Sequence, residues 1–289
     1  MPEGPEVQQV VNSLSPNICS KTIKTVEVLH DKITMPIKSI GRQNIELFSN
    51  RLIDTKILEL ERKGKYLIFK GKNKSSDDLF IVAHLGMTGA FFVVKDFNEI
   101  TPKYRKHIHI IFRLDDNSSM VYSDQRRFGW VGALEEKEFL NYNPIQKIGP
   151  DPFDENAPER FIANMRRKTS ENKPIKKLLL QPEIIAGIGN IYASECLFKA
   201  NIHPMTPSKD ITDKKLMELL SHVRETFALA IRLGGSSIRD YVNSEGQKGT
   251  FQEHFKVYGK KDCPECGHPL ENVRIDNRSS FYCPSCQKK

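Results

Sequence analysis

The pattern of hydrophobic and polar residues divides the chain into a strand-rich first half and a helix-rich second half. Over residues 3–14 apolar side chains recur every three or four positions, which predicts an amphipathic helix that stops near Ser15-Pro16. From about residue 22 to 135 the pattern changes to short runs of β-branched and aromatic residues, which are typical of strands. These runs occupy residues 23–28, 52–60, 66–70, 79–94, 108–114 and 120–122. We therefore predict an antiparallel β-sandwich that carries the N-terminal helix, as one domain over residues 1–135.

Helical periodicity begins after a proline-rich stretch. Residues 136–158 hold four prolines and little periodicity, so we interpret 136–157 as a linker. A helical domain is expected over 158–250, with Thr212 capping its last helix, Gly234-Gly235 ending it, and a polar candidate lid loop over 236–249. Its helices are predicted at 158–168, 174–181, 190–199 and 212–233. Strands followed by helices make the fold class α+β.

Charge and composition narrow the possible partners. The 289 residues include 44 Lys and Arg against 36 Asp and Glu, a formal net charge of +8. An excess of this sign favours an anionic partner, and nucleic acid fits it better than a membrane does. No apolar run of membrane-spanning length and no secretory leader is evident, so we expect a cytoplasmic protein whose thiols stay reduced.

Four of the six cysteines form the most specific local pattern. Cys263 and Cys266 make one C-x2-C pair, and Cys283 and Cys286 make a second, with 16 residues between the pairs. This spacing predicts a closed tetrahedral site for one structural Zn²⁺ per chain, in a module over 251–289 that is too small to fold without metal.

The first residues after Met1 allow two interpretations. If Met1 is removed, Pro2 becomes a free secondary amine, which is partly unprotonated near neutral pH and can attack a sugar aldehyde carbon as a covalent catalyst. Glu3 and Glu6 would then be close enough to move protons. Equally, proline suits the first turn of a helix and glutamate there complements the helix dipole.

Nine short motifs lie in order along the chain: PEGPE (2–6), RKGKYL (62–67), HLGMTG (84–89), KH (106–107), RRFG (126–129), GIGNIYASE (187–195), GGSSIRDY (234–241), VYGK (257–260) and the cysteine module with Arg278. Taken together, they resemble the formamidopyrimidine-DNA glycosylase family over the whole chain. Two positions depart from the family pattern: Gly4 is more typical of the related endonuclease VIII, and Gln125 replaces the usual proline. The resemblance implies a helix–two-turns–helix element in the helical domain and a zinc-finger hairpin at the end.

The resemblance also implies roles at the reacting sugar. Pro2 would attack the deoxyribose C1′, and Glu3 would assist sugar opening and proton transfer, with Glu6 in support. Lys65 would reach the sugar and assist strand cleavage, although a lysine on a basic turn is otherwise an ordinary solvated residue. Arg278 would bind phosphate and help the second, δ-elimination step.

A second set of residues would act on the duplex. Chemistry on a base requires flipping it out of the stack, and the vacated space must be filled. Met87, Arg126 and Phe128 resemble the family's inserted triad, although Phe128 taken alone would fit a buried core. Arg126 would face the orphaned cytosine and Arg127 a phosphate. Further implied DNA contacts are His107, Lys168, Asn190, Tyr258 and, in the lid loop, Ser236, Ser237 and Arg239.

The resulting prediction is a monomeric glycosylase and lyase that acts on damaged double-stranded DNA. It would remove oxidised purines such as 8-oxoguanine and formamidopyrimidines through a Schiff base on Pro2, followed by β- and δ-elimination. Two alternatives remain open at this stage. One is an enzyme with endonuclease VIII specificity for oxidised pyrimidines, which Gly4 suggests. The other is a zinc-ribbon protein that binds DNA without catalysis, which would need neither Pro2 nor Lys65.

Overall fold

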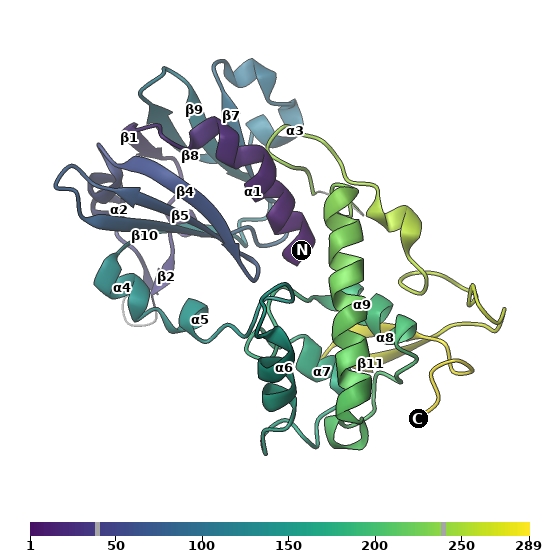
Figure 1. Ribbon diagram of the computed structural model, residues 1–289. Coiled ribbons are helices and arrows are strands. Elements are labelled where there is room, and N and C mark those ends of the chain that lie inside the picture. The colour runs from purple at the N-terminus through teal and green to yellow at the C-terminus, as the bar shows by residue number, and fades with distance from the viewer. Residues whose placement is uncertain (38–40, 238–240) are drawn as a thin grey trace. The chain divides into compact units, whose positions relative to one another are not determined.

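The computed structural model describes residues 1–37, 41–237 and 241–289, and the chain separates into two compact units. Unit 1 comprises Met1–Gln146 together with Gly234–Gly249, and unit 2 comprises Lys147–Leu233 together with Thr250–Lys289. The fold is α+β, as predicted, with most strands in unit 1 and the longest helix, α9, in unit 2 (Figure 1). The segment 234–249, which we assigned to the helical domain, groups with the β-unit instead.

Unit 1 is built from two four-stranded antiparallel sheets. Their strand orders are β1-β8-β9-β7 and β10-β6-β5-β4. The strands are β1 Ile23–Val28, β4 Lys56–Lys63, β5 Tyr66–Lys72, β6 Asp78–His84, β7 Gly89–Val94, β8 Ile108–Leu114, β9 Ser119–Asp124 and β10 Trp130–Glu135, with a small pair β2 Pro36–Ile37 and β3 Gly41–Arg42. Buried residues of both sheets, such as Phe69 of one and Phe112 of the other, belong to one core. The apolar alternation of the sequence therefore produces a sandwich.

Helix α1 (Gly4–Ile18) packs against this sandwich through an apolar stripe that includes Val7, Val10 and Leu14. The predicted end near Ser15-Pro16 is wrong, because the helix continues through Pro16 to Ile18. Proline close to a helix end removes only one hydrogen bond, and Ile18, with no exposed surface, is part of the core. Burial of that side chain outweighs the lost bond.

Other boundaries differ from the sequence pattern for similar reasons. The run over 52–60 is not one strand, because Leu52 ends a helix, α2 (Ile45–Leu52), and β4 starts only at Lys56. The run over 79–94 is divided into β6 and β7 by a turn. The expected linker contains two short helices, α4 (Glu136–Leu140) and α5 (Asn143–Gln146), and a further one, α3 (Pro102–Arg105), precedes β8.

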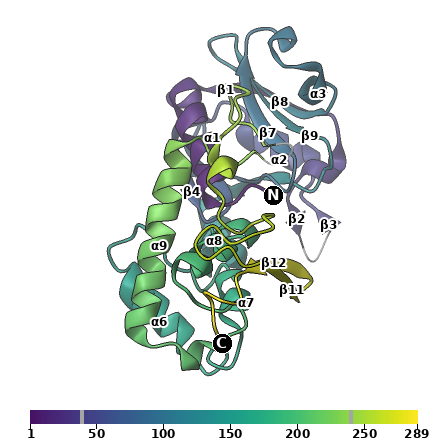
Figure 2. The same ribbon diagram turned by 90° about the vertical axis from the view of Figure 1, so that its right-hand side faces the viewer.

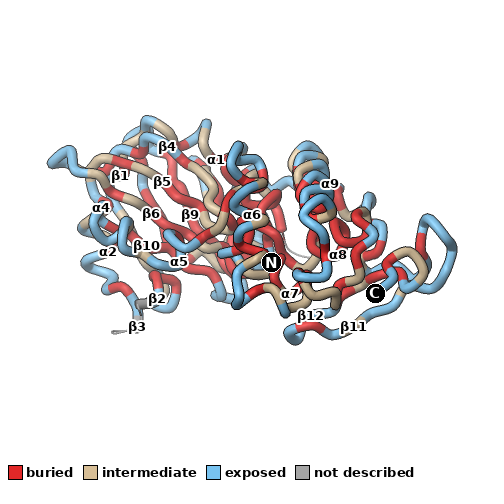
Figure 3. Tube along the Cα trace, turned by 60° about the horizontal axis from the view of Figure 1, so that its bottom comes forward, coloured by how far each residue is buried: buried red, intermediate tan, exposed pale blue. Residues whose placement is uncertain are grey.

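Unit 2 contains four α-helices and a two-stranded hairpin, visible in Figure 2, besides two short 3-10 helices, Ser208–Asp210 and Phe251–His254. The α-helices and strands are α6 Ala157–Met165, α7 Ile175–Leu179, α8 Asn190–Lys199, α9 Asp213–Arg232, β11 Glu271–Ile275 and β12 Arg278–Tyr282. The Thr212 side chain accepts a hydrogen bond from the N–H of Lys215 and caps α9 as predicted. Tyr192 of α8 packs edge-on against Phe227 of α9, and both side chains are buried. Figure 3 colours the buried residues of these two helices red. Among the described residues, no helix combines the length and apolar character that crossing a bilayer requires.

Candidate active site

The N-terminal segment is buried and tied to a distant part of the chain. Glu3 and Glu6 are only 4% and 1% exposed. One oxygen of Glu6, Oε2, accepts the N–H of Glu3 (2.9 Å), while Oε1 accepts both the N–H (2.7 Å) and the hydroxyl (3.0 Å) of Ser236. The hydroxyl of Tyr241 donates to the main-chain carbonyl of Glu6 (3.1 Å). The carboxylate therefore fixes the start of α1 against segment 234–249.

The charges around this segment affect its amino group. Burial lowers the pKa of the Met1 amino group, and the nearby cations of Lys65 and Arg126 lower it further, against the opposing effect of the Glu3 and Glu6 carboxylates. These four predicted residues therefore lie within electrostatic range of the N-terminus. An amine whose pKa is lowered has a larger unprotonated, nucleophilic fraction at neutral pH.

His84, at the end of β6, is another strongly perturbed group of this region. Burial, followed by the charge of Lys65, lowers its pKa to about 4. Its ring Nδ1 accepts the N–H of Gly86 (3.2 Å), and the ring stacks on Trp130. The imidazole is therefore neutral near pH 7 and supports the turn that follows.

The described part of the predicted lid loop is anchored at both ends. Gly234 and Gly235 adopt positive φ (78° and 82°), where side chains are strained, and the backbone of Gly249 lies against them. Further along, the Ser244 hydroxyl contacts that of Ser13 in α1 (2.7 Å). Ser236 and Ser237, expected to meet the flipped nucleotide, use their hydroxyls within the unit. Arg239 lies outside the described residues.

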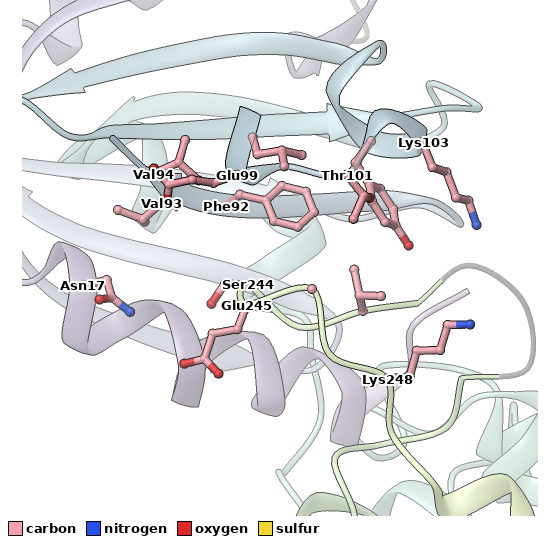
Figure 4. A pocket seen from close by; sticks show the side chains of 14 residues that line it. Asn17, Phe92, Val93, Val94, Glu99, Thr101, Lys103, Ser244, Glu245 and Lys248 are labelled. Atoms are coloured by element: carbon pink, nitrogen blue, oxygen red, sulfur yellow. The ribbon is translucent and has the colours of Figure 1, made fainter. Parts of the chain in front are cut away.

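The same loop lines a cavity of about 520 Å³ on the β-unit. Phe92 of β7 points into it from the sheet, and Lys103 and Lys248 lie at one end (Figure 4). Ser244 and Glu245 approach from the side of the loop. The loop segment 242–248 is thus a wall of the β-unit, and its exposed residues are confined to 245–248.

Met87, Arg126 and Phe128 come together on two neighbouring turns. A guanidinium nitrogen of Arg126, Nη1, contacts the sulfur of Met87 (3.2 Å), and the guanidinium carbon lies 4.6 Å from the centre of the Phe128 ring. Phe128 is 58% exposed and Met87 37%. The buried-core alternative for Phe128 therefore does not hold, and the three side chains form one exposed group with an apolar tip.

Sequence reasoning missed the residue that joins these two turns. Asp124 ends β9 with no exposed surface. Its Oδ1 accepts the Thr88 hydroxyl and the N–H of Arg126 (3.2 Å), and its Oδ2 accepts the N–H of Gly129 (2.8 Å). The only signal in the sequence was an acidic residue ending an apolar strand directly before the RRFG motif.

Arg127 and His107 lie on the same unit. Arg127 has a positive φ of 54°, and its Nη1 contacts Nε2 of His30 (2.5 Å). The His30 ring in turn lies edge-on to that of His109, whose Nε2 contacts the carbonyl of Asp124 (2.9 Å). His107 is half-buried, and its Nε2 has no hydrogen-bond partner among the described residues. A buried ring nitrogen of this kind suits a hydrogen-bond partner from outside the chain.

In unit 2, Asn190 and the strand that begins with Arg278 are neighbours. Asn190 follows the N-cap of α8, its amide nitrogen donates to the carbonyl of Ser279 (2.8 Å), and its Oδ1 is buried without a partner in the part of the chain described here. Lys177 of α7 pairs with Asp276 (2.8 Å) in the turn just before Arg278. Arg278 is exposed at the start of β12. The arrangement presents donors at a helix N-terminus, which favours anions.

One acidic and one basic side chain, which the sequence did not single out, support this region. Glu195 of α8 is buried, and its carboxylate accepts the N–H groups of Lys256 (2.8 Å), Val257 (3.1 Å) and Tyr258 (2.8 Å); burial raises its pKa. Lys176 of α7 is fully buried and donates to the Ser194 hydroxyl (2.5 Å). Lys176 also donates to the main-chain carbonyl of Asn190 (3.4 Å), so both side chains fix backbone next to predicted DNA contacts.

The basic run at 166–168 contains a residue that bonds within the protein, Arg166, and an exposed one, Lys168. Arg166 is structural, because its guanidinium donates to Asp213 and to the carbonyls of Ser208 and Ile211. Lys168 is exposed beyond the end of α6. Of the basic run at 166–168, Lys168 therefore remains accessible to an external partner.

The four predicted zinc ligands converge. Their sulfur atoms all lie within 4.8 Å of one another, with 3.8 Å between Cys263 and Cys286 and 3.5 Å between Cys266 and Cys283. Thiolates bound tetrahedrally about 2.3 Å from zinc are separated by about 3.8 Å. The donor set and its spacing therefore fit one structural Zn²⁺ with no position left for water.

Comparisons with known proteins match these features along the whole chain. Residues 1–131 match the family model of the formamidopyrimidine-DNA glycosylase N-terminal domain, residues 148–242 that of its H2TH domain, and residues 260–289 a zinc finger found in FPG and IleRS. Formamidopyrimidine-DNA glycosylases of Bacillus licheniformis and Bacillus cereus are each 35% identical, with all of both chains covered.

Solved structures agree with the sequence relatives. A Lactococcus lactis FPG mutant in complex with a Fapy-dG containing DNA has a TM-score of 0.83 at 31% identity, covering all of both chains. A complex of the Lactococcus lactis Fpg with an abasic site containing DNA has a TM-score of 0.82 at 31% identity, covering 99% of this chain and 100% of that one.

Proposed function

Because this chain belongs to the formamidopyrimidine-DNA glycosylase family, we propose that it excises oxidised purines from duplex DNA and then cuts the strand as a lyase. The observation that carries the proposal in the chain itself is the N-terminus. In the structure this amino group belongs to Met1; it lies near Glu3, Glu6, Lys65 and Arg126, and burial lowers its pKa. Pro2, whose amine the removal of Met1 would free, directly follows and is buried. A protein that only bound DNA would have no use for a desolvated amine.

The first step uses Pro2 as the nucleophile once Met1 has been removed. The lone pair of the Pro2 nitrogen attacks the deoxyribose C1′, the C1′–N bond to the damaged base breaks, and the base leaves with a proton. We assign Glu3 to give a proton to the ring oxygen as the sugar opens, which leaves an iminium between Pro2 and C1′. Glu6 holds Glu3 and segment 234–249 in register with the amine.

Strand cleavage follows from the iminium. Withdrawal of electrons by the positive nitrogen acidifies the C2′ proton, and its removal breaks the bond from C3′ to oxygen. A second elimination removes the C4′ proton and breaks the bond from C5′ to oxygen, which frees the sugar from the DNA. Water then hydrolyses the iminium and releases the sugar fragment from Pro2. We assign Lys65 to proton transfer at the sugar and Arg278 to the second elimination.

Recognition of the duplex falls to the exposed residues described above. Met87, Arg126 and Phe128 would fill the space of the flipped nucleotide, with Arg126 donating to the orphaned base. The phosphate contacts proposed for the two units are Arg127, His107, Lys168, Asn190, Tyr258 and Arg278, with Arg239 of the lid motif at the flipped nucleotide. Zinc would hold the hairpin that carries Arg278 through the four cysteine thiolates. We further propose a monomer that works in the cytoplasm.

Borohydride trapping on abasic duplex DNA tests the covalent step. Reduction of the iminium links protein and DNA irreversibly, so the expected result is a stable adduct whose peptide map places the DNA on Pro2. The matched control is the same chain with its N-terminus acetylated, which keeps every side chain and should give no adduct. An equal yield from the acetylated protein would put the nucleophile elsewhere, and no adduct from either would favour DNA binding without catalysis. Faster excision of thymine glycol than of 8-oxoguanine would instead favour endonuclease VIII specificity.

A further inference from the structure

Asp124 and Thr88 hold together the two turns that carry Met87, Arg126 and Phe128. We propose that this pair is a clamp that presents the three side chains as one preorganised unit for insertion into the duplex. The inference rests on the proposed function and makes Asp124 and Thr88 positioning residues, since neither is required to touch DNA.

The clamp joins elements that are distant in sequence. Thr88 directly precedes β7 and Asp124 ends β9, and the register of these strands pairs Gly89 with Asp124. The Thr88 hydroxyl donates to Oδ1 of Asp124 and also accepts the N–H of Arg126 (2.9 Å). Asp124 accepts the same N–H of Arg126 (3.2 Å) and also that of Gly129 (2.8 Å) in the RRFG turn. One carboxylate and one hydroxyl thus connect both turns through four hydrogen bonds.

The backbones of the two turns are also in direct contact. A Cβ added to Gly86 would meet the nitrogen of Gly129 at 2.4 Å, and one added to Gly129 would meet the Tyr122 hydroxyl at 2.0 Å. Gly86 also has a positive φ of 57°. Glycine is therefore needed at both positions, and neither turn can move without displacing the other.

This rigidity has a consequence for insertion. Phe128 is held 58% exposed and Met87 37%, although large apolar side chains gain free energy by burial. Base flipping itself requires a few kcal/mol. If Met87, Arg126 and Phe128 are already ordered as they must be in the duplex, their insertion does not add a loss of side-chain and loop entropy to that amount. Loss of the clamp should therefore slow the flipping-dependent step more than it weakens binding.

Four variants separate positioning from general stabilisation. Thr88→Val removes the hydroxyl at nearly constant volume, Thr88→Ser restores it, and Asp124→Asn replaces one acceptor oxygen with a donor. The matched control is Thr55→Val, because Thr55 is equally buried and its hydroxyl donates to the carbonyl of Arg51 (3.1 Å), away from the two turns. Thr88→Val loses the two hydrogen bonds of its hydroxyl, to Asp124 and from Arg126, whereas Thr55→Val loses the one to Arg51.

The readouts distinguish duplex insertion from sugar chemistry. Single-turnover excision is measured at saturating enzyme on duplex DNA with 8-oxoguanine opposite cytosine. Lyase activity is measured on a single-stranded abasic oligonucleotide, where there is no stack to open. A 2-aminopurine beside the lesion reports unstacking by its rise in fluorescence.

Thr88→Val and Asp124→Asn should lower the ratio of the duplex rate to the single-strand rate by roughly 10- to 100-fold, the range expected when a positioned group is displaced by about 1 Å. The 2-aminopurine rise should slow in parallel, while Thr88→Ser stays within about threefold of the wild type on the same scale. A ratio for Thr88→Val equal to that of Thr55→Val, or a Thr88→Ser variant as impaired as Thr88→Val, would overturn the clamp. If Asp124→Asn fails to fold, the two Thr88 variants still decide. A wild-type protein that acts on neither substrate would instead refute the proposed function.

Discussion

Replacement of Glu6 by glutamine tests whether this carboxylate links the N-terminus to segment 234–249. Glu6→Gln keeps the shape of the side chain and changes one acceptor oxygen to an NH₂ group. The two oxygens of Glu6 accept three hydrogen bonds from Glu3 and Ser236. Whichever way the amide turns, a donor faces a donor.

The magnitude follows from these bonds. A buried donor left unpaired costs about 1–3 kcal/mol, and each remaining bond loses about 1 kcal/mol when its acceptor is no longer charged. We expect unit 1 to lose about 3 kcal/mol of unfolding free energy. For a unit of this size that corresponds to a fall in Tm of roughly 6–12 °C.

The assay uses the single tryptophan, Trp130, which lies in β10 of unit 1 and reports its unfolding by fluorescence. Glu59→Gln is the control, since Glu59 is exposed and pairs with Lys70 (3.1 Å) at the surface, where a change of about 0.5 kcal/mol or less is expected. Tryptic cleavage after Lys248 should also accelerate in Glu6→Gln. Equal Tm values and equal cleavage rates for the two variants would refute the linkage.

Three further predictions concern the rest of the molecule. Cys283→Ser should lose zinc and weaken DNA binding while Trp130 fluorescence still reports a folded unit 1; unchanged DNA affinity in the metal-free protein would contradict it. Arg126→Ala should slow excision opposite cytosine and reduce the preference for cytosine over adenine as the opposite base. We expect that preference to be about tenfold or more in the wild type, from a mispairing penalty of about 1–3 kcal/mol. Arg127→Ala should instead weaken binding to all duplexes and lower the salt slope by about one, and the reverse pattern would exchange the two roles. The folded-state pKa of His84 is lowered from 6.5 to about 4, so the unfolded chain binds the proton more tightly than the folded chain does. The free energy of unfolding should therefore fall as the pH drops from 6.5 towards 4, by up to about 3 kcal/mol. His84→Asn, measured by urea unfolding across that range, should remove this part of the pH dependence, and an unchanged slope would show that His84 is not its source.

Periodicity predicted the elements whose burial pattern is regular and local. Helix α8 has the predicted limits, 190–199, and the zinc ligands follow from spacing alone. Periodicity missed the end of α1, because Ile18 is held by tertiary burial that the local signal of Pro16 cannot reveal.

The site shows the same division between local and long-range information. The motifs identify residues that would face DNA, and Pro2, Lys65 and Phe128 are accessible to that reasoning. The motifs did not reveal Asp124, Glu195 or the role of Glu6. These carboxylates satisfy backbone N–H groups, some of which lie up to 230 residues away along the chain. A sequence pattern shows which groups are polar, but only the fold shows which of them are neighbours.

The order of synthesis gives the contact between Glu6 and segment 234–249 a further meaning. The N-terminal end of the chain leaves the ribosome first, whereas Ser236 and Tyr241, which hold it in place, are added more than 200 residues later. At about 5–20 residues per second, roughly 10–50 s separate the two events. Unit 1 can therefore reach its final arrangement only after most of unit 2 has been translated, and a chain released early would carry Pro2 without the groups that fix Glu6 beside it.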